Sequence, residues 1–273
     1  EKLDRSKSDF IAVAAHELKT PLTLVEGYAA MLRDYAERSA EKEAENQLLD
    51  GIHNGTRRLR AIIDDMIDVS LIDNNLLSLH FQPFWVNRLF EILAIEAAAS
   101  LSERGLKLDI TPFEGFDEMN FGDPERLIQV FRNVLNNAIK FTPDGGQIII
   151  SGRKLPGFLE VTVRDTDIGI PPEDQTIIFH KFSRLGDAAL HSSGKTKFKG
   201  GGPGLGLHIA RGIIEAHGGA IWVESPGFDE KSCPGSTFHV LLPIRSVPPD
   251  DKTGKLFDAL TATQTNGGEP IRL

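Results

Sequence analysis

The chain of 273 residues has one cysteine, no long apolar run and no excess of basic residues. A single Cys excludes an internal disulfide framework and any zinc site built from several cysteines. No hydrophobic stretch approaches the roughly 18 residues of a membrane-spanning helix, and no secretory signal is present. The 39 acidic residues outnumber the 30 basic ones, for a net charge of −9. That balance argues against a general nucleic-acid binder.

Residues 1–75 contain two stretches in which apolar residues recur at the spacing of one helix face. In the first, apolar residues recur every three or four positions, at Ile11, Ala14, Leu18, Pro21, Val25, Tyr28 and Leu32. In the second, Ile52, Leu59 and Met66 are seven positions apart, which is the seam spacing of a coiled coil. The pattern predicts two long helices joined across the polar stretch 33–46. Because two helices alone bury little surface, we predict that a second copy completes a four-helix bundle, making the protein a homodimer.

From residue 77, strand and helix signals alternate. We predict strands at 77–84, 106–110, 147–152, 159–164, 220–224 and 236–243, and helices at 87–101, 124–141 and 206–216. The clearest helix start is Asp123-Pro124-Glu125, which combines a capping residue, a first-turn proline and an acidic residue. The predicted fold class is α+β: a helical hairpin over 1–75, an α/β sandwich with a mixed sheet over 76–245, and a disordered tail over 246–273.

His16 is the first candidate for chemistry. It lies about 200° around the helix from Ala14 and Leu18, so the helix presents it away from its apolar stripe. A lone helical His is more often a bystander than a functional group. Here Glu17 follows it directly, and Thr20 lies one turn further on the same face, which favours a functional role. A zinc-protease H-E-x-x-H site is excluded because Thr20 stands where the second His would be.

The helix predicted at 124–141 carries the second candidate group. Asn133, Asn137 and Lys140 share the face opposite its apolar stripe. Asn is a poor helix-interior residue, so a merely solvated face would more naturally carry Glu and Lys. Amide oxygens suit Mg²⁺, and a lysine can meet a phosphate. Downstream, Asp165 ends a strand before a turn at Gly169, where a carboxylate can accept a hydrogen bond from an exocyclic amine such as that of adenine.

The glycine-rich run 200–207 leads into the helix predicted at 206–216. Glycines let the backbone approach a ligand, and a helix N-terminus favours phosphate. The preceding segment 181–199 carries five basic residues and one acidic residue, which favours an anionic ligand over a flexible linker. The glycine spacing matches neither a P-loop nor a dinucleotide-binding fingerprint.

Together these stretches resemble the catalytic core of a sensor histidine kinase of a two-component system. The resemblance rests on an H box at 10–22, an N box at 133–142, a first glycine box around Asp165, an F box at 179–184, a second glycine box at 202–207 and a closing strand motif at 235–238. It covers residues 5 to about 244, in the family's order and spacing. Five boxes in register are far more specific than any one of them.

The resemblance implies a role for each matching position. His16 would be the phosphoacceptor, Glu17 the general base, and Thr20 the residue that orients water when the kinase dephosphorylates its partner. The ATP-binding residues would be Asn133, Asn137, Lys140, Phe141, Asp165, Gly169, Ile170, Arg184, Gly202, Gly204, Leu205, Gly206, Leu207 and Thr237. Asn137 would also hold Mg²⁺, so the implied cofactors are ATP and Mg²⁺.

The resemblance also implies partners and a location. The phosphoryl group would pass from His16 to an Asp on the receiver domain of a response regulator, and no nucleic acid is involved. Since the chain begins at Glu1 rather than Met, we expect a fragment that lacks an upstream sensor domain. We expect it to be cytoplasmic, either as a soluble protein or as the cytoplasmic part of a membrane-bound sensor.

Two positions depart from the family pattern. The first glycine box normally reads Asp-x-Gly-x-Gly, but residue 167 is Asp, and we hypothesise that this weakens ATP binding without abolishing it. Pro203 replaces a common Thr or Ser, where only the backbone is used. Two alternatives follow: a nucleotide-binding regulatory module or pseudokinase disabled by Asp167, and an ATPase of the gyrase and heat-shock chaperone type. The hairpin with His16 argues against the ATPase, which needs no acceptor His.

Overall fold

The computed structural model describes residues 18–32, 42–183 and 204–249. Four residues predicted to act in catalysis or nucleotide binding lie outside these ranges: His16, Glu17, Arg184 and Gly202. The tail predicted to be disordered lies outside them from residue 250 onward.

The N-terminal part is a helical hairpin, as predicted. Residues 18–32 are helical, and α2 spans Lys42–Asp73. The two helices meet where α2 has small residues: a Cβ placed on Gly51 would lie 2.7 Å from the ring of Tyr28, and one on Gly55 would overlap Val25. Val25 and Tyr28 of the first apolar stripe therefore pack against the glycine face of α2, and the absence of side chains there lets the helices come close.

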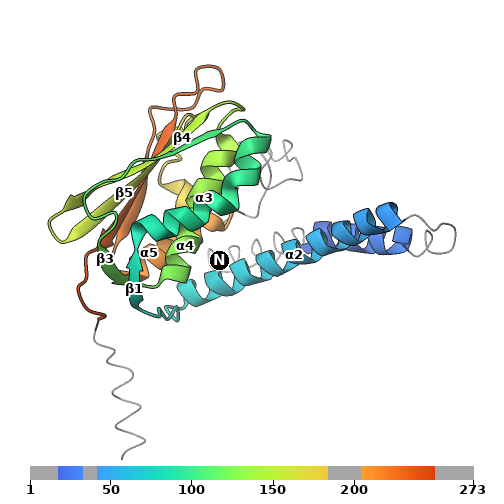
Figure 1. Cartoon of the computed structure of the whole chain (residues 1–273), viewed down its shortest axis with the longest axis horizontal. Coiled ribbons are helices and arrows are strands. Elements are labelled where there is room, and N and C mark those ends of the chain that lie inside the picture. Colours follow the sequence, from blue (N-terminus) through green and yellow to red (C-terminus); the bar gives the residue numbers. More distant parts are fainter. Residues whose placement is uncertain (1–17, 33–41, 184–203, 250–273) are drawn as a thin grey trace, which may run out of the picture.

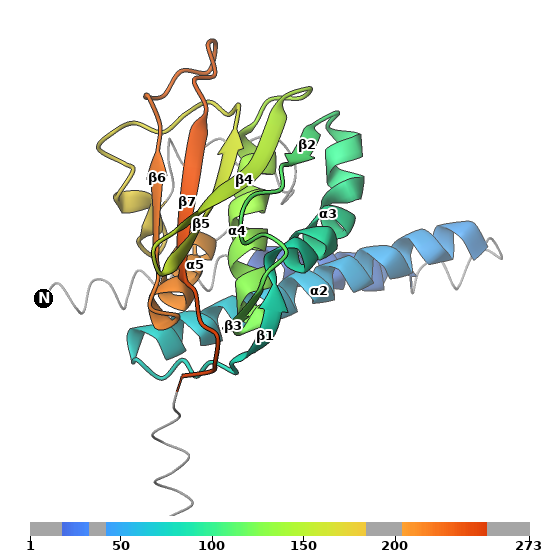
Figure 2. The same ribbon diagram turned by 60° about the vertical axis from the view of Figure 1, so that its left-hand side comes forward.

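The remainder is an α+β unit with a mixed sheet, which confirms the predicted fold class. Its strands are β1 (Gln82–Trp85), β2 (Lys107–Ile110), β3 (Met119–Gly122), β4 (Gln147–Leu155), β5 (Phe158–Asp165), β6 (Ala220–Glu224) and β7 (Ser236–Pro243). Its helices are α3 (Val86–Glu103), α4 (Pro124–Phe141), η1 (Ile177–Phe179) and α5 (Gly206–Ala216). The main sheet has the order β2-β4-β5-β7-β6, with β2 parallel to β4 and the other pairs antiparallel (Figure 2).

The core lies between the sheet and a layer of three helices. In Figure 1, α3, α4 and α5 lie between the sheet and α2. The stripe predicted on α4 is buried: Leu127, Phe131 and Val134 have no exposed surface. On β5, Val161 and Val163 face this layer and are equally buried. Burying one such side chain contributes about 1.5–3 kcal/mol, so this stripe fixes which face of α4 turns away from the core.

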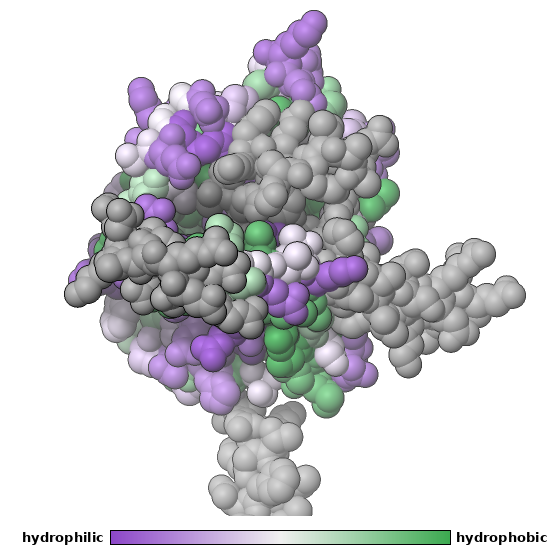
Figure 3. All heavy atoms as spheres, turned by 90° about the vertical axis from the view of Figure 1, so that its right-hand side faces the viewer, coloured by the Kyte–Doolittle hydropathy of each residue, from purple (hydrophilic) through white to green (hydrophobic). Residues whose placement is uncertain are grey.

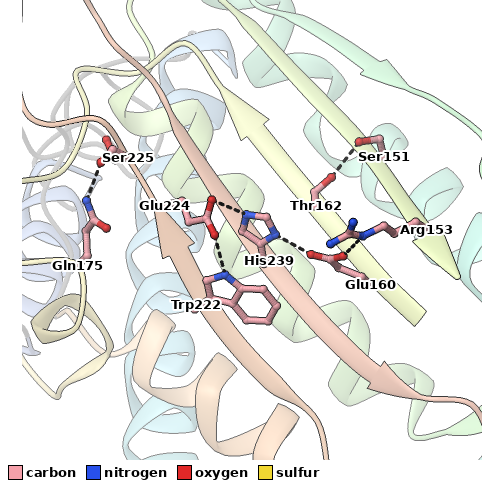
Figure 4. A network of polar contacts seen from close by, with 9 residues as sticks. All are labelled: Ser151, Arg153, Glu160, Thr162, Gln175, Trp222, Glu224, Ser225 and His239. Carbon is pink, nitrogen blue, oxygen red and sulfur yellow. Dashed lines mark hydrogen bonds and ion pairs between the residues drawn. The ribbon is translucent and has the colours of Figure 1, made fainter. Parts of the chain in front are cut away.

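The opposite face of the sheet carries a polar network (Figure 4). The Glu160 carboxylate, almost fully buried, accepts hydrogen bonds from Arg153 and from Nδ1 of His239, the latter at 2.8 Å. The rings of His239 and Trp222 stack in parallel with their centroids 4.8 Å apart. Glu224 lies 3.8 Å from Nε2 of the same histidine. Cross-strand pairs of this kind hold β5, β6 and β7 in register on a face that no described helix covers.

One predicted strand was wrong in extent, and another was missed. The strand expected at 77–84 is reduced to β1, because the backbone N–H of His80 donates to the Asp123 carboxylate at 2.9 Å rather than to a neighbouring strand. β1 pairs with β3, a four-residue strand that was not predicted. The same Asp123 side chain accepts from the backbone N–H of Arg126 at 3.1 Å, which confirms it as the cap of α4.

The C-terminal end of α2 is docked on the α+β unit. Asp68 pairs with Arg126 at 2.7 Å and accepts a hydrogen bond from Gln129 at 2.6 Å, both on α4. Ile72 lies against Gly212 of α5, where any side chain would overlap it. The hairpin and the α+β unit are therefore joined by ion pairs and close packing as well as by the chain itself.

Candidate nucleotide-binding site

The polar face of α4 meets the start of α5. The buried stripe of α4 turns Asn133 towards the segment that begins α5, and its amide donates to the carbonyl of Gly206 at 2.9 Å. A Cβ on Gly206 would lie 3.2 Å from Cγ of Asn133, tighter than an ordinary contact. Asn133 therefore ties the two helices together, and Gly206 provides the space for it.

Two further residues of this face are placed for a ligand. Asn137 is half-buried, and its amide has no hydrogen-bond partner among the residues the structure describes. The Lys140 ammonium lies 4.6 Å from the ring centroid of Phe141. Positions 133, 137 and 140 follow one helix face, so an amide oxygen and an ammonium group lie in line with the start of α5.

Asp165 ends β5 in a buried position with one oxygen unused. The residue is 2% exposed. Its Oδ1 accepts from the backbone N–H groups of Asp167 at 3.2 Å and Ser236 at 3.1 Å, while Oδ2 is buried without a partner among the described residues. A buried acceptor without a donor costs about 1–3 kcal/mol, so this oxygen is poised for a donor from a ligand. Burial, reinforced by the nearby Asp167 carboxyl, raises the pKa of Asp165 well above its usual value.

Asp167, where the family pattern has glycine, turns inward. It is 4% exposed, and its Oδ1 accepts from the backbone N–H of Gly169 at 2.8 Å and from the Ser236 hydroxyl at 2.9 Å. Two carboxyl groups are thus buried side by side at the end of β5, linked by one serine.

Ser236 is the residue of this site that the sequence analysis missed. It pairs with Asp165 across β5 and β7, and its side chain is on the buried face of β7. Thr237, predicted to bind ATP, is on the opposite face, paired with Arg164 and Glu224. A signal was present: Ser236 has the same alternation as the buried Phe238, which places it towards the core.

The turn after Asp165 requires its glycine. Gly169 has φ of +78°, and a Cβ there would collide with the carbonyl of Gly227. The next residue, Ile170, is buried, and its backbone N–H donates to the Ser225 hydroxyl at 3.0 Å. Gln175 donates to the Ser225 carbonyl at 2.8 Å (Figure 4). These contacts fix the turn beside the two carboxyl groups.

The described residues on either side of the segment 184–203 meet next to α5. The backbone N–H of Phe182 donates to the carbonyl of Gly204 at 3.0 Å. Gly204 has φ of +69°, and a Cβ on it would lie 2.9 Å from the carbonyl of Ser183. Leu205 is fully buried, whereas Gly206 and Leu207, which begin α5, are half-buried. The first N–H groups of the helix, with their positive potential, are thus held beside Asn133, an arrangement that suits phosphate.

Comparison with known proteins decides what this site belongs to. Residues 6–75 match the family model for the His kinase A phosphoacceptor domain, and residues 122–246 match the histidine kinase-, DNA gyrase B- and HSP90-like ATPase. The circadian input-output histidine kinase CikA of Synechococcus elongatus is 33% identical over 244 residues, covering 89% of this chain. The chain belongs to the sensor histidine kinases. The chain is a catalytic core that spans 30% of the length of CikA.

Solved histidine kinase structures share the fold. Full-length ShkA in complex with AMPPNP aligns with a TM-score of 0.62 at 20% identity, over 87% of this kinase core and 46% of ShkA. ThkA in complex with the response regulator TrrA aligns with a TM-score of 0.58 at 23% identity, over 90% of the core and 64% of ThkA.

The structure brings most of the predicted ATP-binding residues of the kinase core into one region. Asn133, Asn137, Lys140 and Phe141 come from α4; Asp165 ends β5, and Gly169 and Ile170 lie in the turn after it; Gly204 and Leu205 precede α5, and Gly206 and Leu207 begin it. Thr20 lies on the helical segment 18–32 of the hairpin. Within the described ranges, no group of three His, Cys, Asp or Glu residues is arranged to hold a metal, and no helix is long and apolar enough to cross a membrane.

Proposed function

We propose that this kinase core uses Mg-ATP to phosphorylate His16 and passes the phosphoryl group to an aspartate of a response regulator receiver domain. The hairpin of residues 1–75 would carry the acceptor, and residues 76–245 would bind the nucleotide. The observation that carries the proposal is the buried Oδ2 of Asp165, which has no hydrogen-bond partner among the described residues. A ligand can supply the missing donor to this oxygen, and the 6-amino group of adenine is such a donor.

The residues present fit an adenine nucleotide with its magnesium. Asp165 would accept from the adenine amine, while Lys140 and the first N–H groups of α5 would hold the phosphates. Asn137, whose amide has no other partner among the described residues, would hold Mg²⁺ through its oxygen. The bound metal would supply neutralisation of phosphate charge. ShkA, which shares the fold, was solved with the ATP analogue AMPPNP.

The transfer itself is a displacement at phosphorus. A ring nitrogen of His16 forms a bond to the γ-phosphorus, the bond from that phosphorus to the bridging oxygen breaks, and ADP leaves. Glu17 takes the proton from the other ring nitrogen, which makes the imidazole a better nucleophile. The chain's contribution is positioning and charge stabilisation, because a phosphoryl transfer needs little else from the protein.

The exposed apolar surface of the hairpin supports a homodimer. Six large hydrophobic residues of the described hairpin are 44–58% exposed: Leu22, Leu24, Met31, Leu49, Ile63 and Ile67. Hydrophobic surface is visible from the side to which the hairpin extends (Figure 3). An amphipathic hairpin with two apolar faces buries the second face against a symmetric copy, which gives the four-helix bundle expected from the sequence.

The response regulator is the second proposed partner. The complex of ThkA with its response regulator TrrA, a fold neighbour of this chain, supports a receiver domain as the next acceptor. Thr20, one helical turn beyond His16, would orient a water for the reverse task of dephosphorylating that regulator.

Transfer of labelled γ-phosphate tests the proposal. The protein is incubated with Mg²⁺ and γ-labelled ATP, beside His16→Gln and the matched control His53→Gln, an exposed histidine on α2. We expect acid-labile, base-stable label on the parent protein and on the control, and none on His16→Gln. Absence of label from all three, with ATP still bound, would instead favour a nucleotide-binding module or pseudokinase disabled at Asp167, or a fragment that needs its sensor domain to be switched on. Label that persists on His16→Gln would show that the acceptor is another residue.

A further inference from the structure

Two buried carboxyl groups lie where this family pattern has one. Asp165 is 2% exposed and Asp167 4% exposed, and both contact Ser236, Asp165 through the backbone N–H and Asp167 through the hydroxyl. Burial penalises the charged form of a carboxyl group, and a second carboxylate nearby penalises it further. Such a pair, unless a cation balances it, retains a proton that a single carboxylate would release.

The described surroundings supply no balancing cation. β7 contributes Ser236, and β4 contributes Ile148 opposite Asp165, both uncharged. Arg164 of β5 is exposed on the other face of the strand, and Asp229 in the facing loop accepts from the backbone of its own loop. On α4, the Lys140 ammonium lies over the ring of the adjacent Phe141. No ion pair to either buried carboxyl exists among the described residues.

Hydrogen bonds from neighbouring groups occupy one oxygen of each carboxyl group. Oδ1 of Asp165 already accepts from two backbone N–H groups, and Oδ1 of Asp167 accepts from Gly169 and Ser236. Oδ2 of Asp165 has no donor within the described part of the chain and is the oxygen proposed to face the base. The pKa of Asp165 is raised by burial first and by the Asp167 carboxyl second. A proton on Oδ2 changes the group facing the ligand from an acceptor into a donor.

We propose that Asp167 makes Asp165 a proton-linked selector of the purine 6-substituent. With the proton released, Oδ2 accepts from a 6-amino group and the site takes adenine. With the proton bound, Oδ2 becomes a donor. It then suits the 6-oxo group of a purine, which accepts, and no longer suits a 6-amino group, which is itself a donor. Binding of ATP therefore expels a proton to solvent. The inference rests on the proposed function, because it requires that Asp165 contacts the base.

Comparison of ATP with inosine triphosphate isolates this effect. The two nucleotides differ only at the 6-position and the adjoining N1. Because the triphosphate and its metal are the same in both, their pH dependence drops out of the ratio of the two dissociation constants. The ratio is measured by equilibrium binding to the whole chain from about pH 5.5 to about pH 8. We expect the ratio that favours ATP to shrink as the pH falls, by up to about tenfold per pH unit below the raised pKa of Asp165.

Two variants assign the effect to Asp167. Asp167→Asn keeps an oxygen that can accept from Gly169 and Ser236 but removes the charge, and Asp167→Gly restores the family residue. In both, we expect the loss of ATP preference to move to lower pH, and ATP to bind more tightly at neutral pH. A ratio that is independent of pH in the parent protein, or variants that follow the parent curve, would overturn the inference and leave ATP binding intact. Failure of the parent and both variants to bind either nucleotide at any pH would overturn the proposed function as well.

Discussion

A buried histidine gives the sharpest prediction about stability. His217, just after α5, is 1% exposed. Its Nδ1 donates to the Ile213 carbonyl at 2.8 Å, and its Nε2 accepts from the backbone N–H of Asp123 at 3.0 Å. Both bonds are satisfied only by the neutral ring with its proton on Nδ1. Burial lowers the pKa of His217 from its ordinary value of 6.5, in agreement with that tautomer.

Replacement by phenylalanine separates the ring's volume from its hydrogen bonds. In His217→Phe the N–H of Asp123 loses its partner, whereas the Ile213 carbonyl still accepts from the backbone N–H of residue 217 at 3.1 Å. One buried, unsatisfied donor costs about 1–3 kcal/mol. For a unit of this size that corresponds to a fall of roughly 2–12 °C in the midpoint of thermal unfolding, measured at pH 8 by circular dichroism.

The pH dependence gives the same prediction an independent test. Because the folded state holds His217 neutral, its contribution to stability is complete above about pH 6.5 and is lost as the pH falls through the lowered pKa of the folded state. The difference in the free energy of unfolding between the parent and His217→Phe should therefore become smaller as the pH falls. The control His53→Phe, on the surface of α2, should stay within about 0.5 kcal/mol of the parent at every pH. The reasoning would be refuted if His217→Phe were as stable as the parent at pH 8, or if the difference in unfolding free energy between them increased in acid.

Two further predictions concern the packing of α2 and the open face of the sheet. Gly212→Leu should displace Ile72 and speed proteolysis after the end of α2, with little change in nucleotide affinity; unchanged proteolysis would show that this contact does not dock the hairpin. Arg153, and to a lesser extent His239, lowers the pKa of Glu160 from its ordinary value near 4.5. The contribution of ionised Glu160 to stability is therefore present above pH 4.5 and is lost as the pH falls through the lowered pKa of the folded state. The free energy of unfolding of Glu160→Gln should therefore fall less on acidification than that of the parent. Identical acid unfolding curves would contradict this.

Short-range signals in the sequence determined the boundaries of several elements. α4 begins after Asp123 and ends before Pro143 as predicted, because a cap, a first-turn proline and helix breakers act within a few residues of the position they mark. β6 and β7 also have the predicted bounds, since alternation and flanking turns are local features. The order and spacing of the boxes likewise led to the prediction of Asn137 and Asp165 as site residues without any knowledge of the sheet.

Tertiary structure alone decided what depended on contacts between distant segments. The short β1 exists in place of the longer predicted strand because Asp123, more than 40 positions away, takes a backbone N–H from His80. Ser236 joins the site because β7 pairs antiparallel with β5, and strand order cannot be read from local patterning. The same pairing turns Asp167 inward onto Ser236, so a substitution that the sequence shows only as a missing glycine becomes a second buried carboxyl group beside Asp165. Burial and hydrogen bonding, which the sequence does not specify position by position, set the chemistry of that pair.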